Sequence, residues 1–459
     1  MTKQTRRSEA QVTKQTRRSE AQVTKQTRRS EAQVTKQTRR SEAAPWLEPG
    51  LRHVWLPYTQ MKNTPPPLPV VGSDGVRLRL ADGRTLIDGI ASWWTACHGY
   101  NHPHIQRAVE RQLGILPHVM FGGLTHEPGL ALASRLAEWL PGDLSRVFFS
   151  ESGSVSVEIA MKMALQFHVN RGAPERSKLL AFLGGYHGDT IGAMSVCDPE
   201  EGMHGLFRGL LPEQHLTALP REGAGRAAFE ATLDAHAHEC AALIVEPLIQ
   251  GAGGMRFHDP EVLREAATAA RERGLLVIFD EIFTGFGRTG SRFACEQAGV
   301  VPDVITLSKS LTGGTLPLAA TVASDAVFDA FWSDDTEAAL MHGPTFMANP
   351  LGCAAAMASL DLFEREPRLQ QVRAIETQLG AELEACRGLP GVVDVRVRGA
   401  VGVVQLERIS GLDTLKARFV EEGVWIRPFG DIVYLTPSFT IEPDDLSRLT
   451  GAIARVLAG

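Results

Sequence analysis

Two acidic residues close one apolar run of this sequence, and a lysine lies in the next apolar run. The stretch LLVIFDEIFTGFGRTG ends its apolar part at Asp280 and Glu281, and the stretch VITLSKS carries Lys309. In an open parallel sheet, the residues that follow the strands meet at one edge, and ligands bind there. These residues are therefore candidates for one shared cleft.

An acid and an amine at such an edge suit one kind of chemistry. An isolated lysine is usually solvated, but a desolvated lysine can form an imine with an aldehyde. A carboxylate held against a protonated ring nitrogen, beside a lysine that reaches an aldehyde, is the pair that pyridoxal 5'-phosphate needs. Asp280 and Lys309 are therefore the candidate catalytic pair, with pyridoxal phosphate as the expected cofactor.

The stretch SESGS, residues 150–154, could hold an anion. It follows an apolar run and opens a long helical pattern. Small residues at a helix N-terminus expose backbone N–H groups, and the helix dipole adds partial positive charge there. The same residues also suit ordinary capping by Ser152 or Ser154. From this stretch alone, a phosphate cradle and a helix cap remain equally open.

Several other residues could line a pocket or could be structural. An aromatic such as Tyr186, in GGYHGDT, could stack on a flat cofactor ring or pack within a loop. Trp93 and Trp94 are adjacent, so both cannot bury on one face of a strand, and a binding site or an interface is plausible. Thr345, in HGPTF, could donate to a phosphate or simply belong to a turn. Arg427, near Tyr434, could bind a carboxylate or form a surface ion pair.

The elements that must position these residues alternate along the chain. Short apolar runs separated by helical patterns predict an α/β fold, with a mostly parallel sheet between helices. After Glu364 the pattern changes to a helix over 369–386 and four strands, which predicts a smaller α+β C-terminal domain. The expected strands of the sheet lie at 146–150, 178–188, 241–247, 275–281 and 304–310, and those of the smaller domain at 392–399, 402–407, 424–430 and 432–438.

The N-terminal region differs from the rest. Residues 1–43 repeat the unit TKQTRRSEAQV, which offers only Ala and Val to a core, so we predict a disordered basic leader rather than a polyanion-binding or membrane-binding arm. A proline-rich and aromatic-rich segment follows, and a hairpin is expected around Asp82–Gly83. The expected divisions are the leader 1–43, an N-terminal segment 44–95 packing on the small domain and the active site, a large cofactor-binding domain 96–364 and a small domain 365–459.

Composition excludes several classes of protein. The formal net charge of −6 argues against a dedicated nucleic-acid partner. No apolar run is long enough to predict a membrane span. The six cysteines have no CxxC spacing and therefore no zinc or redox signature, and without a secretory leader they favour the cytoplasm. We expect no metal site.

The stretch from Phe279 to Lys309 resembles the signature of class III (ω-type) aminotransferases, which are fold-type I pyridoxal phosphate enzymes. More narrowly, LPYTQM, SWWTACHGYNHP, HGPTFMANP and RPFGDIVYLTPSF are similar to the adenosylmethionine–8-amino-7-oxononanoate aminotransferases of biotin synthesis. The resemblance covers about Trp46 to Gly459, and the repeated leader lies outside it.

The resemblance implies a role for each matching residue. Lys309 would bind the cofactor aldehyde and later move a proton, Asp280 would pair with the ring nitrogen, and Tyr186 would flank the ring and contact substrate. Gly153 and Ser154 would hold the phosphate, and Pro344 and Thr345 would reach the phosphate of the partner subunit. The substrate pocket would be shaped by Tyr58, Trp93, Trp94, Gly343, Arg427 and Tyr434.

The resemblance also implies a reaction. A homodimer with active sites shared across its interface would move the amino group of S-adenosyl-L-methionine to 8-amino-7-oxononanoate, giving 7,8-diaminononanoate by a ping-pong mechanism. The alternatives are another class III ω-aminotransferase that uses lysine or an ω-amino acid, an aminomutase, or a scaffold protein that has lost the reaction. The presence of both Lys309 and Asp280 argues against the scaffold.

Overall fold

The computed structural model describes residues 44–200, 205–207 and 209–459, so the predicted leader lies outside the described residues. The described chain divides into two units, 44–72 with 78–86, and 73–77 with 87–459. In the first unit, the Leu80 amide donates to the Arg84 carbonyl at 2.8 Å, which confirms the expected hairpin turn. The first elements of the chain are α2 (Leu47–Leu51), β1 (Val70–Asp74), β2 (Arg77–Leu80) and β3 (Thr85–Asp88).

The second unit is built on a sheet that, counted over the described residues, has seven strands in the order β4-β12-β11-β10-β7-β5-β6. Only β12 runs antiparallel to its neighbours, β11 and β4, and the other neighbouring strands of the described sheet pair in parallel. The predicted mostly parallel sheet is confirmed. Its strands are β4 (Leu144–Ser150), β5 (Lys178–Phe182), β6 (His215–Thr217), β7 (Cys240–Val245), β10 (Leu276–Asp280), β11 (Val304–Leu307) and β12 (Ala319–Ser324).

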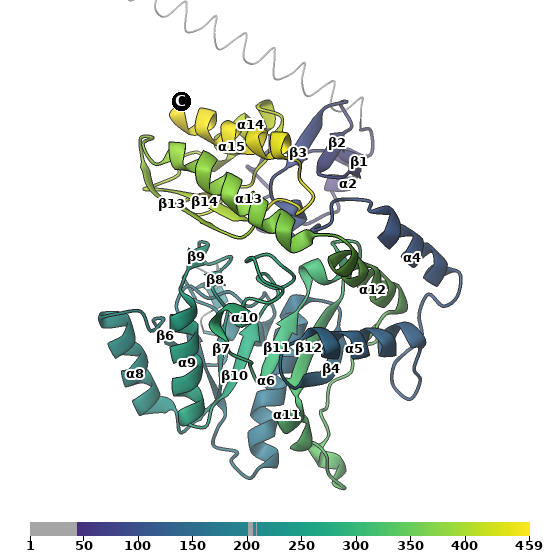
Figure 1. Cartoon of the computed structure of the whole chain (residues 1–459), viewed down its shortest axis with the longest axis vertical. Coiled ribbons are helices and arrows are strands. Elements are labelled where there is room, and N and C mark those ends of the chain that lie inside the picture. Colours follow the sequence, from purple (N-terminus) through teal and green to yellow (C-terminus); the bar gives the residue numbers. More distant parts are fainter. Residues whose placement is uncertain (1–43, 201–204, 208) are drawn as a thin grey trace, which may run out of the picture. The chain divides into compact units, whose positions relative to one another are not determined.

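Helices cover both faces of this sheet, which explains why its strands are apolar throughout. In β10, Val277 and Phe279 belong to the core on one face, and Leu276 and Ile278 belong to the core on the other. Figure 1 shows the helices arranged around the strands. The first core includes residues of α5 (Glu127–Trp139), α8 (Ala224–His236), α9 (Pro260–Glu272) and α12 (Pro350–Arg365), and the second includes residues of α6 (Gly153–Asn170), α7 (Ile191–Ser195) and α11 (Asp325–Asp329).

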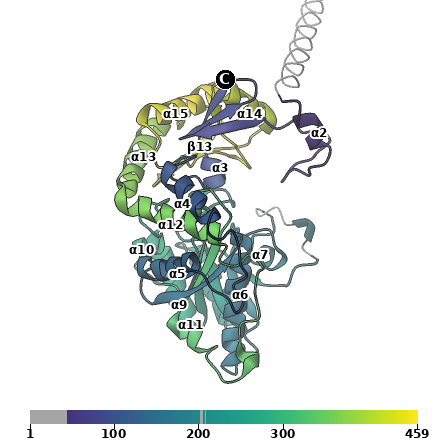
Figure 2. The same ribbon diagram turned by 90° about the vertical axis from the view of Figure 1, so that its right-hand side faces the viewer.

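A stack of helices borders the first core. Helix α12 packs against both α4 (Pro103–Leu113) and α5, and Figure 2 shows the three helices one after another. The N-terminus of α12 is capped by Asn349, whose side-chain oxygen accepts from the backbone amides of Leu351 and Gly352 at 3.1 Å. This cap fixes the point at which the loop that carries Thr345 enters the helix.

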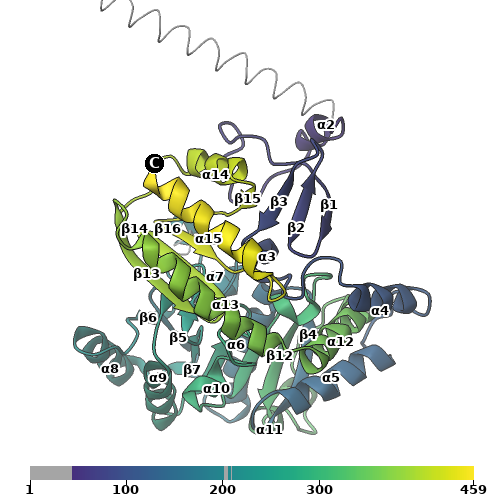
Figure 3. The same cartoon turned by 45° about the horizontal axis from the view of Figure 1, so that its top comes forward.

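The C-terminal part has a hydrophobic core of its own, separate from the two cores of the large sheet. It is built on an antiparallel sheet that, within the described chain, contains β13, β14 and β16. Helices α13 and α15 lie side by side next to this sheet (Figure 3), as the smaller α+β lobe requires. The boundary expected between residues 364 and 365 stays a prediction. The elements are α13 (Arg368–Leu383), β13 (Val392–Arg398), β14 (Val401–Leu406), α14 (Leu412–Glu421), β15 (Val424–Trp425), β16 (Ile432–Leu435) and α15 (Pro443–Ala458).

Two predicted strands are much shorter than expected. The run at 178–188 forms only β5, which ends at Phe182, and the chain leaves the sheet before Gly184, whose φ is 78°. The run at 424–430 forms only β15, which pairs in parallel with β3 at Ile87. Pro428 has no amide hydrogen for a ladder, and Gly430 adopts a φ of 53°, so the chain turns after Trp425. The turn leaves Arg427 on a loop instead of in a strand.

The remaining elements are short and connect the main ones. Among the described helices, none has the length and apolar character needed to cross a bilayer. The short elements are α3 (Ala91–Trp94), η1 (Gly205–Phe207), β8 (Ile249–Gln250), β9 (Arg256–Phe257), α10 (Cys295–Ala298), η2 (Lys309–Thr312), η3 (Thr336–Ala338) and η4 (Glu384–Cys386).

Replacing Phe279 with alanine tests how strongly the sheet core supports the edge that carries Asp280. Phe279 is fully buried, so we expect Phe279→Ala to lower the free energy of unfolding by about 3–5 kcal/mol. Urea unfolding of the apoenzyme measures this loss. Val393, which is 53% exposed in β13, provides the control, and its alanine variant should lose about 0.5 kcal/mol or less. Equal losses in the two variants would contradict the assignment of the core.

Candidate active site

One cavity of about 150 Å³ brings the two candidate catalytic residues together. Its polar residues follow the carboxyl ends of the strands, as expected for ligand sites in parallel sheets. Asp280 closes β10, and Lys309 comes two residues after β11. The cavity is lined by Trp94, Gly153, Ser154, Tyr186, His187, Gly188, Glu246, Asp280, Ile282, Phe283, Ser308 and Lys309.

Lys309 is placed by an unusual backbone conformation. It begins η2 with a φ of 44°, in the left-handed region that non-glycine residues rarely adopt. The loop before it is fixed by Ser308, whose hydroxyl donates to the Leu318 carbonyl at 2.9 Å. The Lys309 amine lies 5.0 Å from the centroid of the Trp94 ring.

The amine of Lys309 is tuned for nucleophilic chemistry. Burial lowers the pKa of Lys309, and the charges of Asp280 and Glu246 only partly oppose this effect. A lowered pKa increases the fraction of uncharged amine, which is the form that attacks an aldehyde. Both carboxylates line the same cavity as the amine.

Asp280 is held from three directions. Its carboxylate accepts from Thr306 Oγ1 and from the Ile282 amide, both at 3.1 Å. On the other oxygen it contacts Nδ1 of the buried His187 at 2.7 Å. Burial alone would lower the pKa of His187, but the hydrogen bond and charge of Asp280 and the charge of Glu246 together raise it. His187 therefore retains its proton more strongly and keeps positive charge beside the carboxylate.

Glu246 is a second buried acid of the cavity. It follows β7 and accepts from the backbone amides of Tyr186 at 2.9 Å and Gly251 at 2.8 Å. Burial raises the pKa of Glu246 to about 7; the charge of His187 acts in the opposite direction, and that of Asp280 raises it further. Glu246 thus fixes the backbone of the loop that presents Tyr186.

Glu281, although adjacent to Asp280, has a different task. It accepts from the Thr284 hydroxyl at 2.9 Å and from the amides of Ala294 at 2.9 Å and Cys295 at 2.8 Å. Burial raises the pKa of Glu281 to about 7, and these three donors act against the rise. Glu281 therefore supports the turn after β10.

The start of α6 contains a helix cap and also lines the cavity. Ser152 is the N-cap, since its side chain accepts from the Val155 amide at 3.4 Å. Gly153 and Ser154 line the cavity at the N-terminus of this 18-residue helix. A Cβ on Gly188 would lie only 2.2 Å from the Ser154 Oγ, so glycine is required for the loop to pass so close. The helix end therefore suits an anionic group such as a phosphate.

Tyr186 lines the same cavity and is oriented by a neighbour. Its hydroxyl donates to Asp189 at 3.0 Å, and the Asp189 amide donates to Ser154 Oγ at 3.1 Å. These bonds connect the aromatic residue to the start of α6, so the loop and the helix form one rigid wall.

Trp93 and Trp94 lie in a left-handed turn. The residues of α3, from Ala91 to Trp94, all have positive φ, between 45° and 74°, and none is glycine. The amides of Trp94 and Thr95 donate at 2.8 Å to carbonyls four residues back. Such a turn costs roughly 1–2 kcal/mol per residue for L-amino acids, so other groups must stabilise it.

Asp88 supplies much of this stabilisation. One carboxylate oxygen accepts from the Ile90 amide and the other from the Ser92 amide, both at 2.9 Å, and the Tyr100 hydroxyl donates to it at 2.5 Å. The Tyr100 hydroxyl also contacts the Ser92 hydroxyl. Burial raises the pKa of Asp88, although these donors oppose the rise. A buried acid therefore determines where both tryptophans project.

The turn connects the cavity to Arg427 and Tyr434. Trp94 packs against Phe283, with ring centroids 4.4 Å apart, and meets Tyr434 at 6.3 Å. Trp93 is 37% exposed, and the Arg427 guanidinium lies 4.6 Å from its ring centroid.

Some residues named from the sequence are not brought into this cavity. Gly343, Pro344 and Thr345 lie in the link between η3 and α12 and are not among the cavity residues. Tyr58 belongs to the first unit of the chain. The roles expected of these residues stay predictions.

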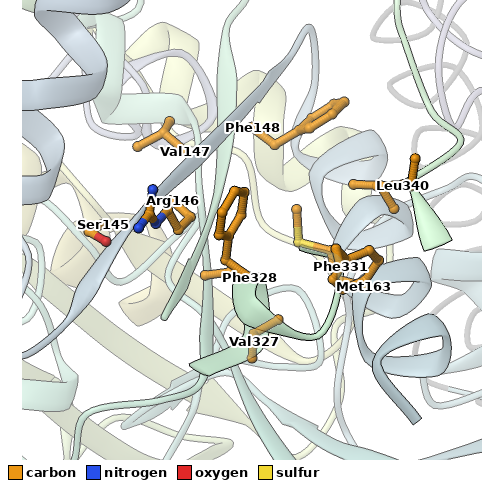
Figure 4. Close-up of a pocket in the computed structure, with 11 residues that line it drawn as sticks. Ser145, Arg146, Val147, Phe148, Met163, Val327, Phe328, Phe331 and Leu340 are labelled. Atoms are coloured by element: carbon orange, nitrogen blue, oxygen red, sulfur yellow. The ribbon is translucent and has the colours of Figure 1, made fainter. Parts of the chain in front are cut away.

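A larger cavity, of about 400 Å³, lies elsewhere (Figure 4). Phe148, Met163, Phe328 and Leu340 are among the residues that make its walls largely apolar. Its one charged residue, Arg146, is engaged by Asp325 at 2.6 Å and by the Phe328 ring. With no free polar group to act on a ligand, we assign it no chemistry.

The family model Aminotransferase class-III matches residues 58–457. The chain belongs to the class III aminotransferases. It is 46% identical over 413 residues to the adenosylmethionine-8-amino-7-oxononanoate aminotransferase of Mycobacterium leprae, with 88% of this chain and 94% of that relative covered. To the relative of the same name from Corynebacterium glutamicum it is 44% identical, with 89% and 97% covered.

Solved structures agree with the family. The chain is similar to the adenosylmethionine-8-amino-7-oxononanoate aminotransferase of Methanocaldococcus jannaschii, with a TM-score of 0.85, 32% identity and 89% and 97% of the two chains covered. It is also similar to an (S)-enantioselective ω-transaminase of Thermomicrobium roseum, with a TM-score of 0.84, 30% identity and 91% and 98% covered. Class III aminotransferases have the fold-type I architecture and depend on pyridoxal 5'-phosphate, and so does this chain.

Sequence reasoning missed three groups that shape the site. His187 and Glu246 each follow a strand of the sheet, so the rule that named Asp280 could also have named them. Asp88 gave no such signal, because its importance depends on the handedness of a turn that contains no glycine.

Asp88→Asn tests whether the acid positions the tryptophan turn of this class III aminotransferase. The amide cannot accept every bond made by the carboxylate, so we expect the variant to lose about 1–3 kcal/mol of stability. Because Trp93 and Arg427 should move, KM should rise about tenfold or more while the lysine-bound cofactor absorbance persists. Tyr100→Phe, which removes one donor, should show a smaller change. The exposed Asp74→Asn serves as the control; an unchanged KM in Asp88→Asn would contradict the role.

Glu246 gives the apoenzyme a defined pH dependence. Its pKa in the folded chain, about 7, exceeds its ordinary value of 4.5, so folding binds a proton between these pH values. Its contribution to stability is therefore full below about pH 4.5 and is lost as the pH rises through about 7, by up to about 3 kcal/mol. The raised pKa of His187 acts in the same direction.

Glu246→Gln should flatten this dependence, because the variant has no proton to lose. Urea unfolding of the apoenzyme from about pH 5 to about pH 8 measures the slope. Glu222→Gln, at an exposed position, should keep the slope of the unmodified chain. An unchanged slope in Glu246→Gln would show that the acid is already ionised across this range.

Proposed function

We propose that this chain transfers the amino group of S-adenosyl-L-methionine to 8-amino-7-oxononanoate, giving 7,8-diaminononanoate, in biotin synthesis. The proposed reaction is supported above all by the observation that Lys309 and Asp280 line one cavity in a class III aminotransferase. The substrate pair is supported by relatives that bear this name at 46% and 44% identity over nearly their whole length.

The cavity residues fit pyridoxal phosphate. Gly153 and Ser154 would hold its phosphate at the N-terminus of α6, where backbone amides and the helix dipole favour an anion. Asp280 would meet the ring nitrogen, and Tyr186 would flank the ring. When bound, the cofactor supplies an electron sink for the charge left on the substrate carbon.

Lys309 would carry the covalent and proton-transfer roles. Its buried amine has a lowered pKa, so it would bond to the aldehyde and, once released, would take the proton from the substrate carbon that bears the amino group and deliver it to the carbon that came from the cofactor aldehyde. His187 would act through Asp280, because its positive charge and hydrogen bond keep that carboxylate in place. Lys309 and His187 would therefore be needed for the chemistry at the cofactor, whichever substrate is bound.

Two unlike substrates must use the same pocket in turn. Arg427 would bind the carboxylate of the oxononanoate, and its guanidinium is already ordered against Trp93. Trp93, Trp94 and Tyr434 would form aromatic walls that suit a sulfonium through cation–π attraction and an alkyl chain through apolar contact. Tyr58 and Gly343 would complete the pocket. Aromatic walls serve both substrates better than a fixed negative charge would.

We further propose a homodimer with shared active sites. Pro344 and Thr345 would reach the phosphate in the partner subunit, which is consistent with the exposure of Thr345 and with its absence from the cavity of its own chain. The proposed location is the cytoplasm, supported by six free, buried cysteines. No nucleic acid or membrane partner is proposed.

A donor assay tests the proposed function. Purified enzyme with 8-amino-7-oxononanoate should form 7,8-diaminononanoate with S-adenosyl-L-methionine, and much more slowly with lysine or alanine. Lys309→Ala should lose the visible absorbance of the lysine-bound cofactor and about 10²-fold or more of the rate, because the proton carrier is gone. The assay measures product by chromatography and cofactor by absorbance.

Other outcomes would redirect the assignment. Efficient turnover with lysine or another ω-amino donor alone would favour another class III ω-aminotransferase, in keeping with the likeness to the Thermomicrobium roseum structure. Movement of nitrogen within one carbon skeleton would indicate an aminomutase. A protein unable to take up pyridoxal phosphate would overturn the catalytic reading altogether.

A further inference from the structure

Three groups that can ligate metals gather at one edge of the large sheet, away from the active site. His215 begins β6, His236 ends α8, and Glu239 lies in the link from α8 to β7. Among the described residues, their ligand atoms form a group that lies within 4.8 Å of one another. The proposed aminotransferase reaction gives this cluster no task.

The three side chains of the cluster are arranged like a set of metal ligands. His215 Nε2 and His236 Nδ1 each lie 3.0 Å from the same oxygen, Oε1 of Glu239. The two imidazole rings stack with centroids 3.9 Å apart and planes 20° apart. Both ring nitrogens thus contact the same carboxylate oxygen. Two imidazoles and one carboxylate form a common protein donor set for Zn²⁺.

The surrounding backbone fixes all three donors. His215 pairs with Leu180 in the parallel ladder of β5 and β6. The carbonyl of Glu239 accepts from the Lys178 amide at 3.0 Å, and the Glu239 amide donates to the His236 carbonyl at 3.1 Å. Donors on such supported positions lose little freedom when they bind an ion.

We propose that His215, His236 and Glu239 bind one divalent transition-metal ion of the zinc type, with water completing the coordination. The ion would replace the shared hydrogen bonds and fasten β6, at the end of the strand order, to the C-terminus of α8. The spacing of 24 residues between His215 and Glu239 explains why the sequence gave no metal signal.

The place of the cluster in the sheet defines its role. His215 is at the amino end of β6, whereas the active-site residues follow the carboxyl ends of their strands. The ion therefore stabilises the fold and takes no part in amino transfer. Removing it should lower thermal stability and leave the activity of the holoenzyme unchanged.

Zinc titration of the tag-free holoenzyme tests the proposal. After treatment with a chelator, the unmodified protein should bind one Zn²⁺ per chain in competition with a chromogenic chelator. His215→Gln and Glu239→Gln should each weaken this binding about tenfold or more, because two donors hold the ion poorly. His238→Gln, at an exposed neighbouring position outside the cluster, is the matched control and should bind like the unmodified chain.

Two further measurements keep the result decisive. Zn²⁺ should raise the melting temperature of the unmodified chain and of His238→Gln, but not that of His215→Gln. If His215→Gln fails to retain the visible cofactor absorbance, His236→Gln replaces it in the titration. Equal zinc affinity in the unmodified chain and in the cluster variants would overturn the proposal. X-ray absorption showing sulfur ligands would overturn it too, since nitrogen and oxygen ligands at about 2.0–2.2 Å are expected.

Discussion

Burying several ionisable groups together, so that each compensates another, is the constraint on which this structure depends. An isolated charge in a protein interior costs several kcal/mol after relaxation. At the cavity, Asp280 and Glu246 bring negative charge and His187 and Lys309 can bring positive charge. The parallel sheet makes the arrangement possible, because it delivers each group from a different strand to one edge.

Strained backbone conformations are a second cost in free energy of folding, and they are concentrated around the same cavity. Lys309 and the tryptophan turn adopt left-handed conformations that non-glycine residues avoid. They persist because Asp88 binds the amides of the turn and because Ser308 fixes the approach to Lys309. The rigid surroundings thus hold a reactive amine and two large aromatic rings in positions that an isolated peptide would not keep.

The shared architecture and the individual chemistry come from different parts of the chain. The fold is as similar to an ω-transaminase structure, with a TM-score of 0.84, as to the Methanocaldococcus jannaschii enzyme, with 0.85. The shared fold therefore does not determine the substrate, and we propose that substrate choice resides in the turn that carries Trp93 and Trp94 and in the loop that carries Arg427. The cluster at β6 lies in yet another place, where it can affect stability without affecting catalysis.

The sequence by itself determined the alternation of strands and helices and the family, and it named Lys309 and Asp280 as the candidate catalytic pair, because apolar periodicity and a long local motif are contained in consecutive residues. It overestimated the strand at 424–430, where Pro428 and Gly430 turn the chain. Only the tertiary structure decided that His187 and Glu246 face the same cavity, that Asp88 holds a left-handed turn, and that His215 meets Glu239. Those facts depend on contacts between distant segments and on backbone handedness, and neither leaves a local pattern in the order of the residues.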